Sequence, residues 1–217
     1  MSFISFEKIR ESKDNLLMPK NDPNTGLFRF QHPTDYLPWA GMLVVMAAAA
    51  TAEYLNGRVV WCKVGDLVPW SWDIWSAHNS QHFIDPYSFT HLLHGIVEFW
   101  LIGLLFRKVP VVWRMLIAVA IEGSWEIAEN SSFVINRYRE ATISLDYFGD
   151  SIINSMSDIC CCGLGFLIAY KIRFWWSLAL FVFVEAVLIV TIHDSLIINV
   201  IMLLFPLESL RRWQMGG

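Results

Sequence analysis

Histidine and acidic side chains recur at helical spacing within three segments of this sequence that are otherwise mostly apolar. They are His91, His94 and Glu98 in the first segment, Glu122, Glu126 and Glu129 in the second, and Asp150, Asn154 and Asp158 in the third. Residues three, four or seven positions apart lie on the same face of an α-helix. Each segment therefore presents one polar stripe, and an unpaired charge in such surroundings would be costly.

These side chains suit the chemistry of a metal ion or of proton transfer. Imidazole and carboxylate groups together bind zinc, iron or manganese, and helical bundles are able to hold carboxylate-rich metal sites. The expected metal ligands are His91, His94, Glu98, Glu122 and Glu126. The expected catalytic acid–base groups are Glu126, Glu129, Asp150 and Asp158.

Two other interpretations of the same residues stay open. The carboxylates can pair with the histidines and with Arg137 and Arg139, which would set the register of the helices and nothing more. Alternatively, they form a metal-free substrate pocket in which a carboxyl group gives and takes protons. We expect Arg137, Arg139, Tyr147 and Asn154 to bind the substrate, with the arginines holding an anionic group.

The segments that carry the stripes have the length and composition of membrane-spanning helices. Hydrophobic residues make up 55% of the 217 residues and charged residues 17%, whereas soluble domains contain about 25% charged residues. A helix needs about 20 mostly apolar residues to cross the hydrocarbon. Five segments qualify or nearly do, and they are Leu37–Leu55, Phe89–Phe106, Val109–Ala128, Ser151–Tyr170 and Phe174–Ile192.

A sixth apolar segment, Leu196–Leu207, is shorter, and we expect it to span as well. With six spans and a cytoplasmic N-terminus, 12 of the 16 Lys and Arg residues fall on the cytoplasmic side. This asymmetry follows the positive-inside rule and predicts both termini in the cytoplasm. The polar stripes then lie toward the outer leaflet. Trp70, Trp72 and Trp75 indicate an interfacial, Trp-rich segment on the same outer side.

The sequence thus predicts an all-α integral membrane protein, a bundle of five to six transmembrane helices. We expect a polar cytoplasmic N-terminal tail over residues 1–36 and a helical transmembrane domain over residues 37–217. The tail has no apolar run behind a basic start, which argues against a cleavable signal peptide. A net charge of −4 without a basic block argues against nucleic-acid binding.

Several stretches of the chain resemble a family of uncharacterised bacterial multi-pass membrane proteins. The matching motifs are N-S-Q-H at Asn79–His82, H-x-x-H-G at His91–Gly95, E-x-x-W-E-x-x-E-N at Glu122–Asn130, R-Y-R-x-A-T at Arg137–Thr142, and D-Y-x-G-D-S-x-x-N-S-x-x-D at Asp146–Asp158. The resemblance covers residues 55–217 and implies a protein of the cell inner membrane without an assigned reaction. A weaker likeness to the VanZ-like family favours a site shared by the second, third and fourth helices.

The four cysteines do not form a disulfide framework. Cys160, Cys161 and Cys162 are adjacent within an apolar stretch, where cysteines are usually small packing residues. Cys62 is alone in a loop, and no second cysteine pair supplies a metal motif. The chain has "WCKVGD" where many members of the resembling family have C-x-C-G, which argues against a cysteine-based role for Cys62.

Together these features predict a membrane protein with a His/Glu/Asp site toward the outer leaflet. The leading hypothesis is a metal-dependent or acid–base enzyme that acts on a lipid-linked or amphipathic substrate, with membrane lipid around it. The alternative is a non-catalytic subunit or assembly factor of a larger membrane complex. An ion conduit fits less well, because the cytoplasmic halves of the same helices are apolar, as in "FWLIGLLF".

Overall fold

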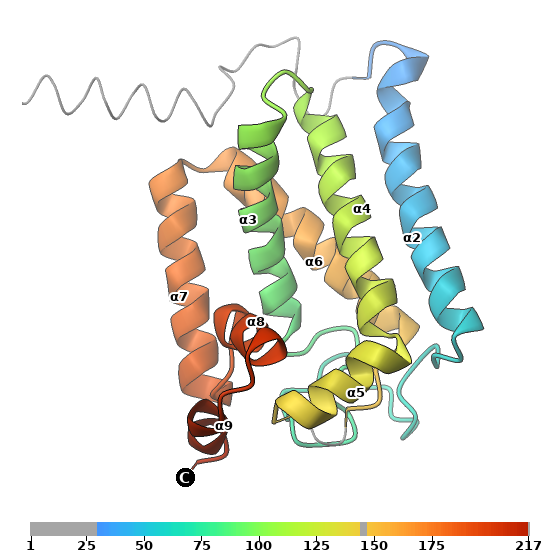
Figure 1. Ribbon diagram of the computed structural model, residues 1–217. Helices are drawn as coiled ribbons and strands as arrows, with labels where there is room; N and C mark the ends of the chain where they lie inside the picture. Colours follow the sequence, from blue (N-terminus) through green and yellow to red (C-terminus); the bar gives the residue numbers. More distant parts are fainter. Residues whose placement is uncertain (1–29, 144–146, 217) are drawn as a thin grey trace, which may run out of the picture.

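A computed structural model describes residues 30–143 and 147–216, and this part of the chain forms eight α-helices and no β-strand (Figure 1). The helices are α2 (Leu37–Leu55), α3 (Ser88–Leu105), α4 (Val111–Glu129), α5 (Ser132–Ala141), α6 (Ile152–Lys171), α7 (Phe174–Ile192), α8 (Leu196–Leu204) and α9 (Glu208–Gln214). A short 3-10 helix, η1 (Pro33–Tyr36), leads into α2. The predicted all-α class is confirmed. Most of the predicted tail, residues 1–29, and Asp146 of the last family motif lie outside the described residues.

Four of the described helical segments are long and apolar enough to cross a membrane: η1 with α2, α3, α6 and α7. α4 has 19 residues but also carries Arg114 and the three glutamates. α8 has only nine residues, and at 1.5 Å per residue it covers about 14 Å, less than half of the hydrocarbon thickness. The expectation that Leu196–Leu207 spans the membrane is therefore not met.

The short α8 is held at both ends by charged side chains from other helices. At its N-terminus, the carboxylate of Glu185 on α7 accepts hydrogen bonds from Leu196 N at 2.9 Å and Ile197 N at 3.3 Å. At its C-terminus, the guanidinium of Arg137 on α5 donates to Leu203 O at 2.9 and 2.8 Å. An anion at the N-terminus and a cation at the C-terminus stabilise a helix through its dipole. α8 is thus fastened to the end of the bundle.

This arrangement places the two ends of the described chain at opposite ends of the bundle (Figure 1). The five long helices alternate in direction, and α8 and α9 stay at the end where α7 finishes. Because α8 does not return the chain across the bundle, the described residues give no support to the prediction that both termini lie on one side of the membrane.

Helices α3 and α6 cross in backbone contact, and this crossing brings two of the polar stripes together. A β-carbon on Gly95 would overlap the carbonyl oxygen of Cys162, and one on Gly165 would overlap that of Leu92. Small residues at helix crossings allow this close approach in membrane proteins. The crossing is completed by the edge-to-face rings of Phe99 and Phe166, whose centroids are 5.1 Å apart.

The end of the bundle opposite residue 30 is covered by the loop of residues 56–87 and by α5 (Figure 1). The loop contacts the start of α6, where Ser151 N donates to Ser80 O at 2.9 Å and Ile152 N donates to Val59 O at 2.9 Å. α5 begins directly after Ser131, whose hydroxyl caps it by accepting a hydrogen bond from Val134 N. Trp70 and Trp75 of the loop are exposed.

Candidate functional site

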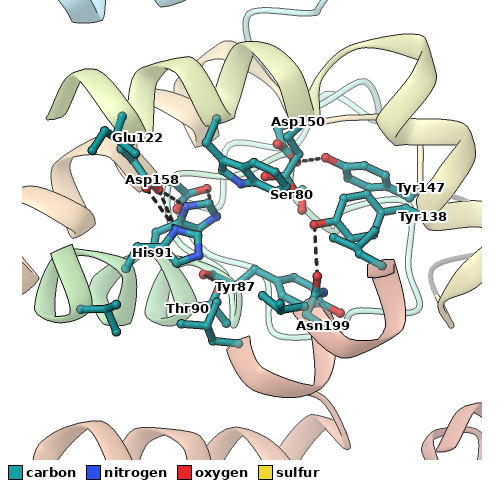
Figure 2. Close-up of a pocket in the computed structure, with 18 of the residues that line it drawn as sticks. Ser80, Tyr87, Thr90, His91, Glu122, Tyr138, Tyr147, Asp150, Asp158 and Asn199 are labelled. Atoms are coloured by element: carbon teal, nitrogen blue, oxygen red, sulfur yellow. Dashed lines mark hydrogen bonds and ion pairs between the residues drawn. The ribbon is translucent and has the colours of Figure 1, made fainter. Parts of the chain in front are cut away.

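A cavity of about 420 Å³ lies at this covered end of the bundle, between α3, α4, α6 and α8. Figure 2 shows His91, Glu122 and Asp158 together on one side of it, and Tyr138, Tyr147 and Asp150 on the other. Among the described residues that line the cavity there is no Lys or Arg. The lining acids are Glu98, Glu122, Glu129, Asp150 and Asp158, and the lining histidines are His91 and His94.

His91 is the centre of the acidic cluster. It lies on α3, is 6% exposed, and its Nδ1 atom contacts the carboxylate of Glu122 on α4. The same Nδ1 atom is 3.2 Å from Glu126 Oε1, and Nε2 is 4.0 Å from Asp158 Oδ2 on α6. One imidazole therefore faces carboxylates from two other helices, as the three polar stripes predicted.

Glu122 lies between two imidazoles. His94 Nδ1 is 3.2 and 3.0 Å from the two carboxylate oxygens of Glu122. Three groups of potential metal ligands each have their donor atoms within 4.8 Å: His91, His94 and Glu122; His91, Glu126 and Glu129; and Glu98, Glu122 and Cys162. The structure brings all five residues expected as metal ligands into these groups.

Glu126 is fully buried but does not line the cavity. Neither of its carboxylate oxygens has a hydrogen-bond partner, and its approach to His91 lacks hydrogen-bond geometry. A buried carboxylate without partners is costly to keep charged. Glu129, one turn further along α4, does line the cavity, as do Trp125 and Tyr138.

Asp150 lies at the rim of the cavity, just before α6. Its carboxylate accepts a hydrogen bond from Tyr147 Oη at 2.9 Å and one from Asn130 Nδ2 at 3.2 Å. Asn130 Oδ1 in turn accepts from Asp150 N at 2.7 Å. Burial is the largest influence on Asp150 and raises its pKa to about 6. Asp150 and Tyr147 are thus placed for proton exchange at the cavity wall.

The predicted substrate-binding arginines do not reach the cavity. Arg137 binds the carbonyl of Leu203, and Arg139 Nε donates to Tyr147 O at 2.6 Å while its guanidinium lies 4.9 Å from the centre of the Phe148 ring. The guanidinium groups that were expected to hold an anionic group therefore donate to backbone carbonyls instead. Asn154 also lies outside the lining and donates to Asp85 Oδ2 at 3.4 Å.

Several cavity residues were not identified from the sequence. Tyr138 Oη donates to Asn199 Oδ1 of α8 at 3.2 Å, and both residues line the cavity. Asp85 does not line the cavity but lies just before α3; it is 1% exposed and accepts hydrogen bonds from Tyr87 N and Ser88 N, and burial raises its pKa. An Asp just before a helix is a capping signal, so Asp85 was recognisable as a helix start.

The cavity also has an apolar side that reaches the surface of the bundle. Ile121 of α4 and Val200 of α8 both line it and are 50% and 45% exposed. Val97 and Leu196 line the same space. The site therefore combines an acidic, imidazole-bearing interior with an apolar opening.

Comparison of the chain with known proteins finds one matching family. A family model described as "Protein of unknown function (DUF2585)" matches residues 53–216. The chain is 42% identical over 175 residues to a UPF0314 protein of Brucella anthropi, which covers 81% of this chain and 89% of that protein. It is also 42% identical over 176 residues to a UPF0314 protein of Paracoccus denitrificans, covering 81% and 91%. No solved structure matches.

Proposed function

Since this chain belongs to the DUF2585 family of bacterial proteins of unknown function, we propose its function from the site itself. We propose a membrane-embedded enzyme that binds a divalent transition metal ion (zinc, iron or manganese) and acts on an amphipathic, lipid-linked substrate. The cavity would hold the metal and the reacting group of the substrate, and the apolar opening would accommodate its hydrocarbon part.

The imbalance of charge around His91 is the observation that carries this proposal. Five carboxyl groups line the cavity without any lining Lys or Arg among the described residues, and Glu126 is buried behind them. Within the described part of the chain, the two imidazoles are the only lining side chains able to take a positive charge. A bound divalent cation would compensate these carboxylates and satisfy donor atoms that already lie within 4.8 Å of one another.

Separate roles for the residues follow from their positions. His91, His94 and Glu122 would bind the metal directly, with Glu98 or Glu126 completing the set. A metal in such a site polarises a bound oxygen or lowers the pKa of bound water. Glu129, Asp150 and Asp158 line the remaining wall and would move protons to and from the substrate.

The apolar opening supports an amphipathic substrate. A substrate with a hydrocarbon chain would enter between Ile121 and Val200 without leaving the lipid. We expect Val200→Trp to narrow this opening without touching the metal ligands. The variant should retain its metal and lose co-purified amphiphile in native mass spectrometry, and equal amphiphile in both proteins would contradict this route of entry.

The proposed topology has five spans. Four are the apolar helices α2, α3, α6 and α7. The fifth is the more charged α4, which would cross between α3 and α6. If the N-terminus lies in the cytoplasm, ten of the 16 Lys and Arg residues lie on the cytoplasmic side and six on the side of the cavity. This excess agrees with the positive-inside rule. The cavity, the Trp-rich loop and the C-terminus would then face the outer side of the inner membrane.

Metal content is the direct test of the proposed function. We expect the full chain, purified in mild detergent, to carry a transition metal, and His91→Ala combined with His94→Ala to lower the content by about one equivalent. His193→Asn is the matched control, because His193 does not line the cavity but packs edge-to-face against Trp213, and Asn tolerates its positive φ. Unchanged metal content in the double variant would overturn the proposal.

The competing role as a subunit of a larger membrane complex rests on the exposed tryptophans of the loop. Trp70, Trp72 and Trp75 are 63%, 48% and 58% exposed, which suits a membrane interface and equally a protein partner. Co-purification in mild detergent separates these roles. A stoichiometric partner that still assembles with the His91→Ala, His94→Ala variant would favour the subunit.

A further inference from the structure

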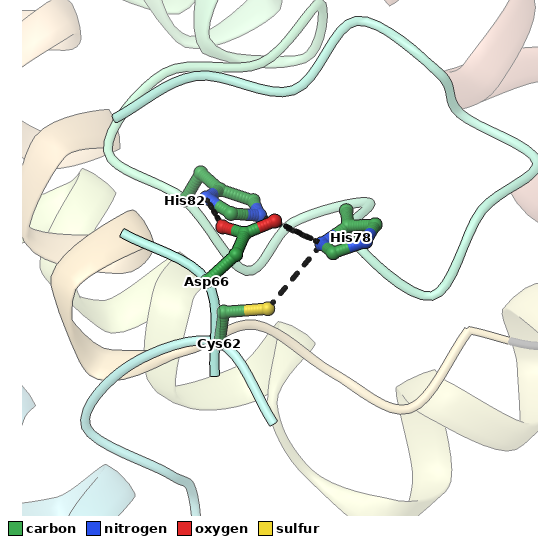
Figure 3. Close-up of side chains that lie close together, drawn as sticks. All are labelled: Cys62, Asp66, His78 and His82. Carbon is green, nitrogen blue, oxygen red and sulfur yellow. Dashed lines mark hydrogen bonds and ion pairs between the residues drawn. The ribbon is translucent and has the colours of Figure 1, made fainter. Parts of the chain in front are cut away.

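Four potential metal ligands outside the cavity converge in the loop between α2 and α3. Cys62, Asp66, His78 and His82 each offer one donor atom, and these atoms all lie within 4.8 Å of one another. Figure 3 shows the four side chains turned toward a common centre, with Cys62 and Asp66 coming from one stretch of the loop and the histidines from another. His82 is 1% exposed and Cys62 is 6% exposed.

The Nδ1 atom of His78 lies close to a donor atom of each of the other three residues. It lies 3.0 Å from His82 Nε2, 3.3 Å from Asp66 Oδ2 and 3.5 Å from Cys62 Sγ. In tetrahedral zinc sites, Zn–N and Zn–O bonds of about 2.1 Å and Zn–S bonds of about 2.3 Å put neighbouring ligand atoms about 3.3–3.6 Å apart. The observed separations are close to these ligand–ligand distances.

The protonation pattern of the cluster also points to a cation. The Nδ1 atom of His82 faces the carbonyl oxygen of Val68, which can only accept a hydrogen bond, so this nitrogen carries the ring proton. Its Nε2 atom therefore presents a lone pair to the centre. At the centre this lone pair meets the sulfur of Cys62, the carboxylate of Asp66 and Nδ1 of His78, and one metal ion would accept an electron pair from all four groups.

We propose that Cys62, Asp66, His78 and His82 bind one zinc ion. Each ligand pair is separated by three residues, a spacing typical of zinc sites built from two short ligand pairs. Four protein ligands leave no position for a substrate, which is the arrangement of a structural site. The contact from His82 Nδ1 to the Val68 carbonyl is the second-sphere interaction that orients a metal-bound histidine.

The position of the zinc indicates what it stabilises. The turn from His78 to His82 includes Ser80, whose φ of 56° lies in the left-handed region that serine rarely adopts. Asn79 and Ser80 line the cavity, and Ser80 O accepts the hydrogen bond from Ser151 N at the start of α6. A zinc ion that holds both ends of this turn would keep one wall of the cavity in place.

Thiol protection in the unaltered chain tests this site without any substitution. The full chain in detergent is loaded with zinc or treated with a chelator, then alkylated with a maleimide, and each cysteine is followed by peptide mass spectrometry. We expect zinc to slow alkylation of Cys62 by about tenfold or more, because a metal-bound thiolate is not free to react. Cys160, which is exposed and outside the cluster, is the internal control.

Substitutions then separate this site from the cavity. Cys62→Ser and His82→Ala should each lower the zinc content by about one equivalent, while the His91→Ala, His94→Ala variant should keep Cys62 protected. Asp66→Asn should also lower the zinc content. Asp73→Asn is its control in the same loop, because the carboxylate of Asp73 accepts a hydrogen bond from Trp75 N and lies outside the cluster. Equal alkylation of Cys62 with and without zinc, or unchanged zinc content in the ligand variants, would overturn the loop site and leave the cavity proposal standing.

Discussion

At the scale of single residues, Glu122 is the side chain that links the two histidines of the cavity. Its carboxylate contacts His91 and lies 3.0 Å from His94 Nδ1. Glu122→Gln preserves the size of the side chain but removes its charge. We expect metal affinity, measured by competition with a chromogenic chelator, to fall by about tenfold or more. Glu140→Gln, on the exposed face of α5, should bind the metal as the unaltered chain does, and equal affinity in both variants would exclude Glu122 as a ligand.

Asp194, between α7 and α8, should make stability depend on pH. It is 1% exposed and accepts hydrogen bonds from Ser195 N and Tyr87 Oη, and burial raises its pKa to about 6. The folded chain therefore holds this proton more tightly than the unfolded chain does, so stability falls as pH rises through about 4 to 6.

Asp194→Asn should reduce that pH dependence, because the amide does not titrate. We expect the difference in thermal unfolding temperature between pH 5 and pH 7 to be smaller in the variant than in the unaltered chain. Asp150 titrates in the same range, so part of the dependence should persist. A pH dependence of the same size in both proteins would show that Asp194 is not the responsible group.

At the scale of the elements, the crossing of α3 and α6 positions the site. Gly165→Ala would place a methyl group against the carbonyl of Leu92, which cannot move without separating the helices. Overpacking of this kind costs about 1–3 kcal/mol. Gly163→Ala on the same helix meets only Met115 Cε at 3.6 Å. We expect a large loss of stability in detergent only for Gly165→Ala, and two similar losses would argue against the close crossing.

At the scale of the whole molecule, the proposed five-span topology puts the C-terminus on the other side of the membrane from the one that the sequence predicts. With five long helices, the C-terminus should lie outside the cytoplasm if the N-terminus lies inside. Alkaline phosphatase fused to the C-terminus should be active, because its disulfides form only in an oxidising compartment. The same enzyme fused after Lys108, in the loop between α3 and α4, should be inactive. The reverse pattern, or inactivity of both fusions, would contradict the five-span topology.

Much of the framework was predictable because it depends on local periodicity. The bounds of α2 and α7 match the predicted Leu37–Leu55 and Phe174–Ile192. The spacing of His91, His94 and Glu98 and of the glutamates on α4 placed each set on one helical face, since 3.6 residues per turn leaves no choice. Amphipathic stripes in apolar helices must face one another or water, so their meeting was also predictable.

Contacts between distant segments were decided only by the tertiary structure. Nothing local shows that Arg137 binds the end of α8, because its partner is a carbonyl 66 residues away. Cys62 was set aside for lack of a cysteine partner, whereas the fold brings it to two histidines and an aspartate. The sequence by itself determined which faces of the helices are polar. The packing of irregular loops and of α8, for which no period exists, determined which of those polar groups share a site.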